Sequence, residues 1–219
     1  MYTLCWSPKG GSGTTVVAAT LAVLAARRAP TVIVDLGGDI GAALGVDVSG
    51  SPGVGDWLCS SGAPATRLWQ LAHTCSGRGG HDLCLVPQGA MPPGSHLTDL
   101  AAERLATAAA QHHGHVVIDA GRILPQGPLL ECASRSLLIV RPCYLALRRA
   151  CSSSSGRSDL VLITEPRRTL SRHDVEHALG EPVVAELPWD PAVARAVDAG
   201  LLAMRVPSAT ARVLGRLLS

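Results

Sequence analysis

Short runs of consecutive apolar residues recur along the chain, separated by helix-like or glycine-rich stretches. Within each run the apolar character is continuous rather than alternating, which is typical of parallel strands covered on both faces. We expect strands over residues 2–6, 31–35, 82–86, 115–119, 136–141, 159–164 and 183–187.

Helical patterns lie between these runs, over residues 14–28, 97–111, 145–151, 172–179, 192–199 and 208–218. Alternation of strands and helices predicts an α/β fold: a doubly wound, mostly parallel sheet with helices on both faces. We expect one domain over residues 1–219, with turn-rich loops at 37–55 and 76–80 and a connector at 152–156.

Composition narrows the class of protein. Apolar residues make up 47% of the chain but aromatics only 3%, so the core must consist of Val, Leu, Ile and Ala. Seven cysteines without a C-x-x-C spacing indicate reduced thiols and a cytoplasmic protein. We expect no signal peptide and no membrane span, because no apolar run reaches the roughly 20 residues that a span requires.

A glycine-rich segment joins the first strand to the first helix. Gly10, Gly11 and Gly13 fall within four positions, and glycines let successive N–H groups turn inward to bind an anion. The helix that follows adds its dipole, and the Thr15 hydroxyl can reach a phosphate-bound Mg²⁺. A plain glycine turn is the alternative, but the strand before and the helix after favour a phosphate loop.

The single lysine of the chain, Lys9, lies in this segment, whereas the other eighteen of its nineteen basic residues are arginines. Lysine carries a compact point charge and arginine a broad planar fork. A tight loop around phosphates has room for a lysine and favours it over an arginine. Chance placement is the alternative, and the surrounding glycines argue against it.

Two predicted strands end in aspartate, at Asp35 and Asp119. At the carboxyl end of a parallel strand such a residue can hold Mg²⁺ beside a phosphate loop. An aspartate that only caps the following turn is the alternative for either residue.

The segment Lys9-Gly10-Gly11-Ser12-Gly13-Thr14-Thr15 resembles the deviant Walker A motif K-G-G-x-G-K-[ST] of the MinD/ParA family at six of its seven positions. The resemblance implies that these residues bind ATP or ADP with Mg²⁺. It also implies a homodimer in which Lys9 reaches the nucleotide of the partner subunit.

The same resemblance extends to the aspartates: Asp35 matches the first switch aspartate and Asp119 the Walker B aspartate. It therefore implies Lys9 and Asp35 as catalytic residues and Thr15, Asp35 and Asp119 as magnesium ligands. The short length and the Gly-Gly-Asp segment at 37–39 are most similar to the CpaE/TadZ branch, which positions pilus machinery.

The chain departs from the family pattern at several places, among them the proline that usually follows the Walker B aspartate, which is Ala120 here. Position 14 holds Thr instead of lysine, Gly37 replaces a water-positioning aspartate, and Thr-Glu-Pro-Arg at 164–167 replaces the Asn-Arg that reads adenine. We expect a switch protein that binds nucleotide, hydrolyses it slowly or not at all, and positions a chromosome, septum or pilus machinery through a protein partner. A scaffold without nucleotide and an amide-ligase or dethiobiotin-synthetase-like enzyme are the alternatives.

Other clusters carry weaker signals. A basic face could bind DNA non-specifically, although solvated helix faces are favoured at a net charge of +2. The tail at 211–218 is a poor lipid anchor, so a membrane partner is not favoured. Two histidine-containing clusters lack zinc spacing and are interpreted as loop residues. The basic face would comprise Arg148, Arg149, Arg167, Arg168 and Arg172. The two histidine-containing clusters are His112, His113 and His115, and His73, Cys75, His81 and Cys84.

Overall fold

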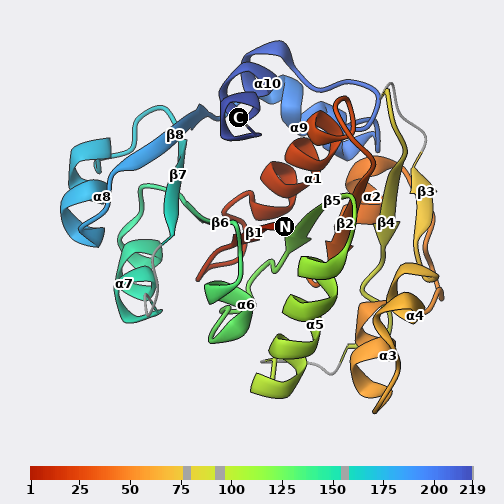
Figure 1. Cartoon of the computed structure of the whole chain (residues 1–219). Coiled ribbons are helices and arrows are strands. Elements are labelled where there is room, and N and C mark those ends of the chain that lie inside the picture. Colours follow the sequence, from red (N-terminus) through yellow and green to blue (C-terminus); the bar gives the residue numbers. More distant parts are fainter. Residues whose placement is uncertain (76–79, 92–96, 154–157, 219) are drawn as a thin grey trace.

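A computed structural model describes residues 1–75, 80–91, 97–153 and 158–218 of the chain. Its centre is an eight-stranded sheet with the strand order β3-β4-β2-β5-β1-β6-β7-β8 (Figure 1). Neighbouring strands are parallel except β3, which runs antiparallel to β4. The predicted mostly parallel sheet is confirmed.

All seven predicted strands are present. Four match their predicted bounds: β1 (Tyr2–Trp6), β2 (Thr31–Asp35), β5 (His115–Asp119) and β7 (Asp159–Thr164). Three differ by a residue at one or both ends: β4 (Leu83–Val86), β6 (Arg135–Val140) and β8 (Val183–Pro188). The short edge strand β3 (His73–Cys75) was not predicted, because its three residues, of which only Cys75 is buried, give no apolar run.

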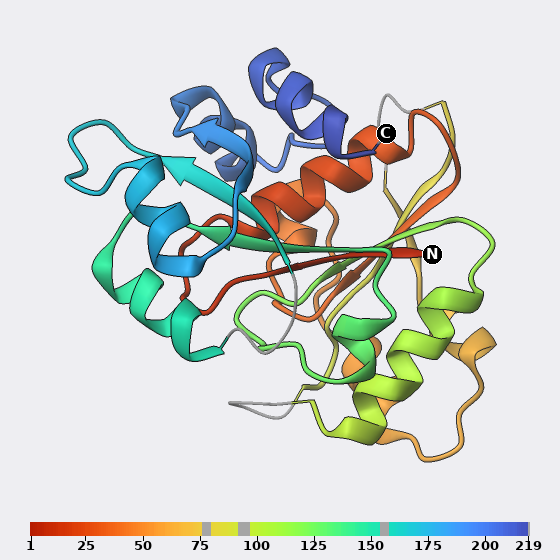
Figure 2. The same cartoon turned by 60° about the vertical axis from the view of Figure 1, so that its left-hand side comes forward.

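Helices cover both faces of the sheet, as predicted (Figure 2). One face is covered by α1 (Thr14–Ala25), α2 (Ile40–Leu44), α9 (Pro191–Asp198) and α10 (Ser208–Gly215), the last continuing into the 3₁₀ turn η1 (Arg216–Leu218). The opposite face is covered by α3 (Val54–Cys59), α4 (Ala65–Trp69), α5 (Asp99–Gln111), α6 (Pro128–Glu131), α7 (Tyr144–Ser153) and α8 (Arg172–Leu179).

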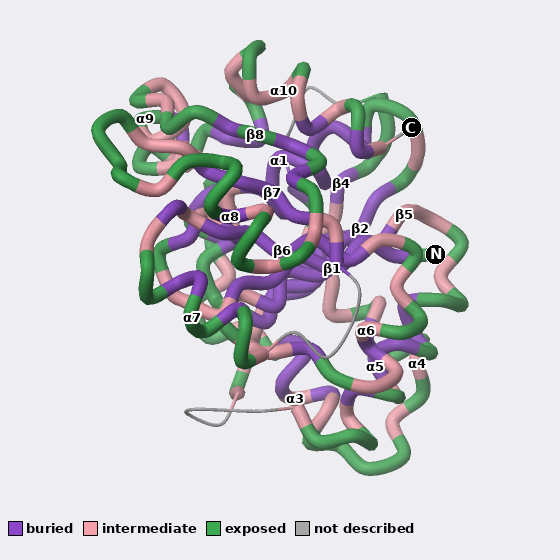
Figure 3. Tube along the Cα trace, turned by 90° about the vertical axis from the view of Figure 1, so that its left-hand side faces the viewer, coloured by how far each residue is buried: buried purple, intermediate pink, exposed green. Residues whose placement is uncertain are grey.

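The two faces of the sheet have separate apolar cores. Along β1, Leu4 and Trp6 pack into one core while Cys5 between them packs into the other. Both sets are buried, and the central strands β1 and β2 are buried along their whole length (Figure 3). This two-sided burial explains the continuous apolar runs in the sequence.

The predicted loop at 37–55 is wrong in part, because it contains α2 and the start of α3. Helices α4 and α6 were also missed. Each of these helices has four to six residues, too few to show a helical period. Of the predicted loop at 76–80 only Gly80 is described, and of the connector at 152–156 only Ser152 and Ser153, which belong to α7.

The apolar stretch after the glycine loop forms α1, whose residues are almost all buried between the sheet and α10. This burial accounts for its apolar composition. Within the described part of the chain, no helix is long and apolar enough to cross a bilayer.

Candidate functional site

Three loops meet at one edge of the sheet. Strands β2, β5 and β1 are neighbours and run parallel, so the loops that follow them start side by side. Backbone hydrogen bonds tie the loops together: Ser7 N–H donates to the Gly121 carbonyl at 3.0 Å, and Leu36 N–H to the Asp119 carbonyl at 2.9 Å. The loop edge is therefore a single connected structure.

The glycine loop has the strand–loop–helix context that its sequence predicts. Gly11 and Gly13 have φ angles of 73° and 95°, values that other residues rarely adopt. The Ser12 hydroxyl donates to the Lys9 carbonyl at 2.8 Å and braces the loop. Gly13 precedes α1 without a side-chain cap, so the first-turn N–H groups have no partner within the helix. This geometry suits an anion.

Lys9 folds back onto its own loop. Its Nζ donates to the Gly10 carbonyl at 3.3 Å, and the residue is partly exposed. The ammonium group of Lys9 therefore lies against the glycine loop of its own chain. Its catalytic role stays a prediction.

Asp35 is buried and has both carboxylate oxygens engaged. Oδ1 accepts from the N–H groups of Gly37 at 2.9 Å and Gly38 at 2.6 Å, and Oδ2 from Ile40 N–H at 2.9 Å. Burial raises the pKa of Asp35, while these bonds act in the opposite direction. The carboxylate therefore shapes the turn that leads into α2, and its roles in catalysis and metal binding stay predictions.

Asp119 is the register partner of Asp35 on the neighbouring strand and is fully buried. Its Oδ1 accepts from Gly121 N–H at 2.9 Å, but Oδ2 has no hydrogen-bond partner among the described residues. Burial, and then the charge of Asp35, raise the pKa of Asp119 to about 7, although hydrogen bonds from the Thr15 side chain and the Gly121 N–H act in the opposite direction. An orphaned carboxylate oxygen therefore lies beside the start of α1.

This arrangement fits Mg²⁺ held together with a nucleotide. Among residues 1–75, 80–91, 97–153 and 158–218, no three His, Cys, Asp or Glu side chains form a metal-binding group. Mg²⁺, however, is commonly held by one or two carboxylates plus phosphate oxygens and water. The free Oδ2 of Asp119 and the nearby Thr15 side chain are suitable partners for such an ion.

Gly37 and Gly121 bring the loops after β2 and β5 into close contact. A Cβ on Gly121, whose φ is 55°, would lie 3.1 Å from the Gly37 Cα. A Cβ on Gly37 would lie 3.6 Å from both Asp119 Oδ2 and Asp35 Oδ1. The position where the resemblance expects an aspartate therefore faces both carboxylates.

Arg122 is a site residue that was missed by sequence reasoning. Its side chain passes over the glycine loop, so that a Cβ on Gly10 would lie 2.9 Å from Arg122 Cδ. The available signal was its place directly after the Asp119-Ala120-Gly121 turn.

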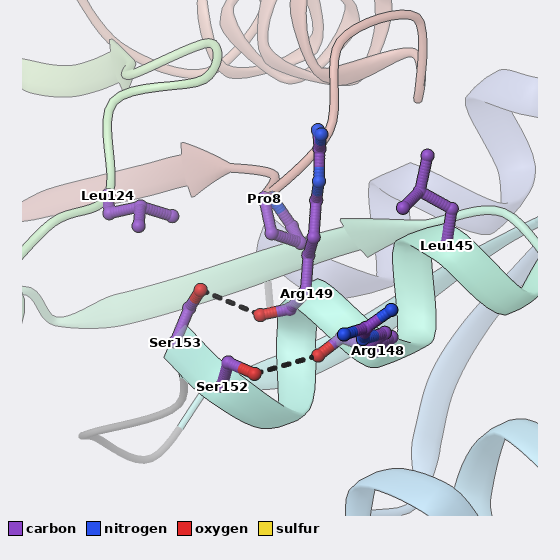
Figure 4. A pocket seen from close by; sticks show the side chains of 7 residues that line it. All are labelled: Pro8, Leu124, Leu145, Arg148, Arg149, Ser152 and Ser153. Atoms are coloured by element: carbon purple, nitrogen blue, oxygen red, sulfur yellow. Dashed lines mark hydrogen bonds between the residues drawn. The ribbon is translucent and has the colours of Figure 1, made fainter.

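A hollow of about 340 Å³ opens beside the loop (Figure 4). Arg149 extends from α7 past Pro8, which begins the glycine loop. Across the described residues, neither Arg148 nor Arg149 forms an ion pair. The remaining wall is made by Leu124, Leu145, Ser152 and Ser153.

Within the described part of the chain, two other arginines of the predicted basic face form ion pairs, unlike Arg148 and Arg149. Arg172 pairs with Glu176 at 2.9 Å, and Arg168 pairs with Glu165. Glu165, in the segment where the family reads adenine, also pairs with Arg141 at 2.5 Å. These contacts reduce the charge available for DNA at Arg168 and Arg172.

The histidine and cysteine clusters show no metal-binding arrangement within the described ranges. All seven cysteines are free thiols. His112 Nδ1 accepts from Gly114 N–H at 2.9 Å, which gives it a local structural role.

No family model matches the sequence, and no curated protein does either. Solved structures match almost the whole chain. The fold is that of the ParA and MinD ATPases. A ParA family ATPase from Chlorobium tepidum TLS has a TM-score of 0.70 at 18% identity, covering 97% of this chain and 95% of its own. MinD from Pyrococcus horikoshii OT3, complexed with Mg-ADP, has a TM-score of 0.68 at 17% identity, covering 99% of this chain and 93% of its own.

A putative plasmid partition protein from Borrelia burgdorferi B31, bound to AMPPNP, has a TM-score of 0.69 at 13% identity, covering 99% of this chain and 96% of its own. The predicted resemblance to the ParA and MinD proteins is thereby confirmed for the fold. The ParA-like fold places its glycine loop, Asp35 and Asp119 at one edge of the sheet.

Proposed function

We propose that this chain is a ParA/MinD-like switch protein that binds ATP with Mg²⁺ and, in that state, pairs with a second copy. The observation that carries the proposal is the orphaned, buried Oδ2 of Asp119 beside Thr15, at the uncapped start of α1. A buried carboxylate oxygen without a partner is costly unless a cation or a donor reaches it. Bound Mg²⁺ would satisfy it.

Residues 10–15 would hold the phosphates through backbone N–H groups and the dipole of α1. Bound Mg²⁺ would neutralise charge that develops on the phosphates. Gly11 and Gly13 permit the loop conformation, and Thr15 and Asp119 would hold the ion with phosphate oxygens.

Hydrolysis is proposed to be slow or absent. Thr14, which is 6% exposed, carries no charge where the family motif has a lysine. Gly37 provides no group to orient an attacking water. Phosphoryl transfer depends on such positioning and charge stabilisation, and losing one such donor can slow a reaction by a factor of about 10²–10³. Nucleotide binding is proposed to persist through the loop N–H groups, the dipole of α1, Thr15 and Mg²⁺.

Lys9 is proposed to act across the dimer. In the single chain its ammonium rests on the Gly10 carbonyl at 3.3 Å, a weak contact that a partner's phosphate would replace. Related folds occur in complexes with protein partners, as in MinC:MinD of Aquifex aeolicus. We propose that this chain likewise uses its nucleotide-bound dimer to engage a protein whose position it controls.

The deciding experiment measures ATP affinity by calorimetry and oligomeric state by light scattering, each with and without Mg²⁺. Wild type is expected to bind Mg-ATP and to dimerise, whereas Lys9→Ala should bind but stay monomeric. Turnover should be below that of ordinary members of this fold class. Rapid hydrolysis that Lys9→Ala leaves unchanged would reject the proposal.

A nucleotide-free scaffold is the second candidate, favoured by the uncharged Thr14 and by Gly37. It predicts no heat of binding with Mg-ATP and the same oligomeric state with and without nucleotide. Those two measurements therefore separate the candidates without knowledge of the partner.

A further inference from the structure

The glycine loop has a second cationic neighbour besides Lys9. Arg122 lies across Gly10 so closely that an added Cβ would be 2.9 Å from its Cδ and 3.7 Å from its Nε. A side chain at position 10 would displace the Arg122 side chain from this path. The absence of a side chain at Gly10 therefore allows an arginine from another loop to lie against the phosphate loop.

The backbone on which Arg122 stands is fixed to the glycine loop. Ser7 N–H donates to the carbonyl of Gly121, the residue before Arg122, at 3.0 Å. Gly121 N–H is in turn held by Asp119 Oδ1 at 2.9 Å. The position of Arg122 is thus set by the same residue whose other oxygen is free for Mg²⁺.

The guanidinium of Arg122 is not engaged by an acidic partner. It is exposed, and among the residues that the structure describes it forms no ion pair. By contrast, Arg135, Arg141, Arg168 and Arg172 all pair with carboxylates. An arginine held beside an anion-binding loop without a counter-ion is available to a ligand's phosphates.

We propose that Arg122 binds the polyphosphate of ATP in cis and replaces the positive charge that Thr14 does not supply. This inference rests on the proposed nucleotide binding and adds a residue that the family motif does not include. The lysine of the family motif would stand at position 14 in α1, whereas Arg122 approaches the phosphates from the loop after β5. Its planar fork can contact two phosphate oxygens at once.

The test compares Mg-ATP affinity by calorimetry for wild type, Arg122→Ala, Arg122→Gln and Thr14→Lys, and for the double variant Arg122→Ala/Thr14→Lys. Arg122→Ala and Arg122→Gln should each weaken binding about tenfold or more. If Arg122 stands in for the missing lysine, Thr14→Lys should restore most of the affinity in the double variant, while adding less to the wild type. Such coupling would not arise from an arginine that only covers the loop.

The matched control is Arg205→Ala, an exposed arginine after α9 with no ion pair among the described residues. It removes the same charge and should leave affinity within twofold of wild type. Circular dichroism and thermal melts of the nucleotide-free variants confirm that each one folds. Arg122→Gln, which keeps the side chain as far as Cδ and removes the charge, serves if Arg122→Ala does not fold.

The possible results separate the two proposals. Wild type that binds Mg-ATP, together with Arg122 variants within twofold of it, overturns the role of Arg122 but leaves nucleotide binding intact. An equal loss in Arg205→Ala also overturns it, because net charge would then explain the effect. Wild type that shows no binding rejects the proposed function, and the role of Arg122 falls with it.

Discussion

The loops after β2 and β5 begin alike but differ in how many hydrogen bonds they donate to the aspartate at their start. Each follows a strand that ends in a buried aspartate, and Asp35 and Asp119 are paired in register. The first loop donates three backbone N–H groups to its carboxylate, whereas the second donates one. One aspartate is therefore satisfied by its own turn, while the other keeps an oxygen without a partner among the described residues.

The difference arises from where each loop goes next. After Asp35 the chain curls over the carboxylate and starts α2, so the N–H groups of residues 37, 38 and 40 point at it. After Asp119 the chain instead crosses toward Ser7 and Gly10. The hydrogen bonds of Asp35 fit the turn-capping interpretation of a strand-end aspartate, whereas the free oxygen of Asp119 fits the proposed ligand-binding one.

Removing each carboxylate should lower stability by clearly different amounts. Asp35→Ala leaves three N–H groups without their acceptor and should lower the free energy of unfolding by about 3 kcal/mol. Asp119→Ala removes one accepted bond and also a buried charge, so its loss should be at least about 2 kcal/mol smaller. Urea denaturation without nucleotide measures both. Equal losses would show that the two turns are equivalent.

Stability should also depend on pH through Asp119. Its pKa is raised from 3.8 to about 7 in the folded state, so the folded chain binds more protons than the unfolded chain between these values. The contribution of Asp119 to stability is therefore largest below the unfolded pKa and should fall by about 2 kcal/mol between pH 5 and 7.

Asp119→Asn is the control for this pH dependence and should flatten it. Burial lowers the pKa of His115, which makes stability rise with pH and opposes the effect of Asp119. The difference between wild type and Asp119→Asn cancels that contribution. A curve that Asp119→Asn leaves unchanged would place the titration elsewhere, including at Asp35, whose pKa is also raised.

Magnesium dependence sharpens the comparison further. Asp119→Asn keeps an oxygen and the size of the side chain but loses the negative charge, so Mg²⁺ should no longer increase ATP affinity. We expect about a tenfold loss of affinity with Mg²⁺, roughly 1.4 kcal/mol, and little change without it. Calorimetry in magnesium and in EDTA measures this. A loss of the same size in EDTA would contradict a magnesium role for Asp119.

Much of the fold could be predicted from sequence because two-sided burial makes each central strand a continuous apolar run. Strands β1, β2, β5 and β7 match their predicted bounds. The edge strand β3 and the short helices α2, α3, α4 and α6 could not be predicted, since three to six residues cannot show a period. These elements depend on contacts distant in sequence.

The candidate site divides in a similar way into features that the sequence indicates and features that it does not. The glycine spacing, Lys9 and the strand-end aspartates are local patterns, so the sequence alone indicates them. The contact between Arg122 and Gly10 joins residues 112 positions apart, and the partners of Asp35 depend on how its turn closes. A motif can name a residue type, but the hydrogen bonds decide whether that residue is free to bind a ligand.

The smallest expected effect concerns Gly37, which lies between the two carboxylates. A Cβ there would meet its neighbours at 3.6 Å, an ordinary contact distance, so Gly37→Ala should change stability by no more than about 0.5 kcal/mol. Gly37→Asp would add a third carboxylate facing Asp35 Oδ1 and Asp119 Oδ2. Like charges repel, so Gly37→Asp should be less stable than Gly37→Ala at pH 8, and added Mg²⁺ should narrow the gap. Thermal melts of the pair with and without Mg²⁺ measure it; an unchanged gap would mean that position 37 does not face a cation site.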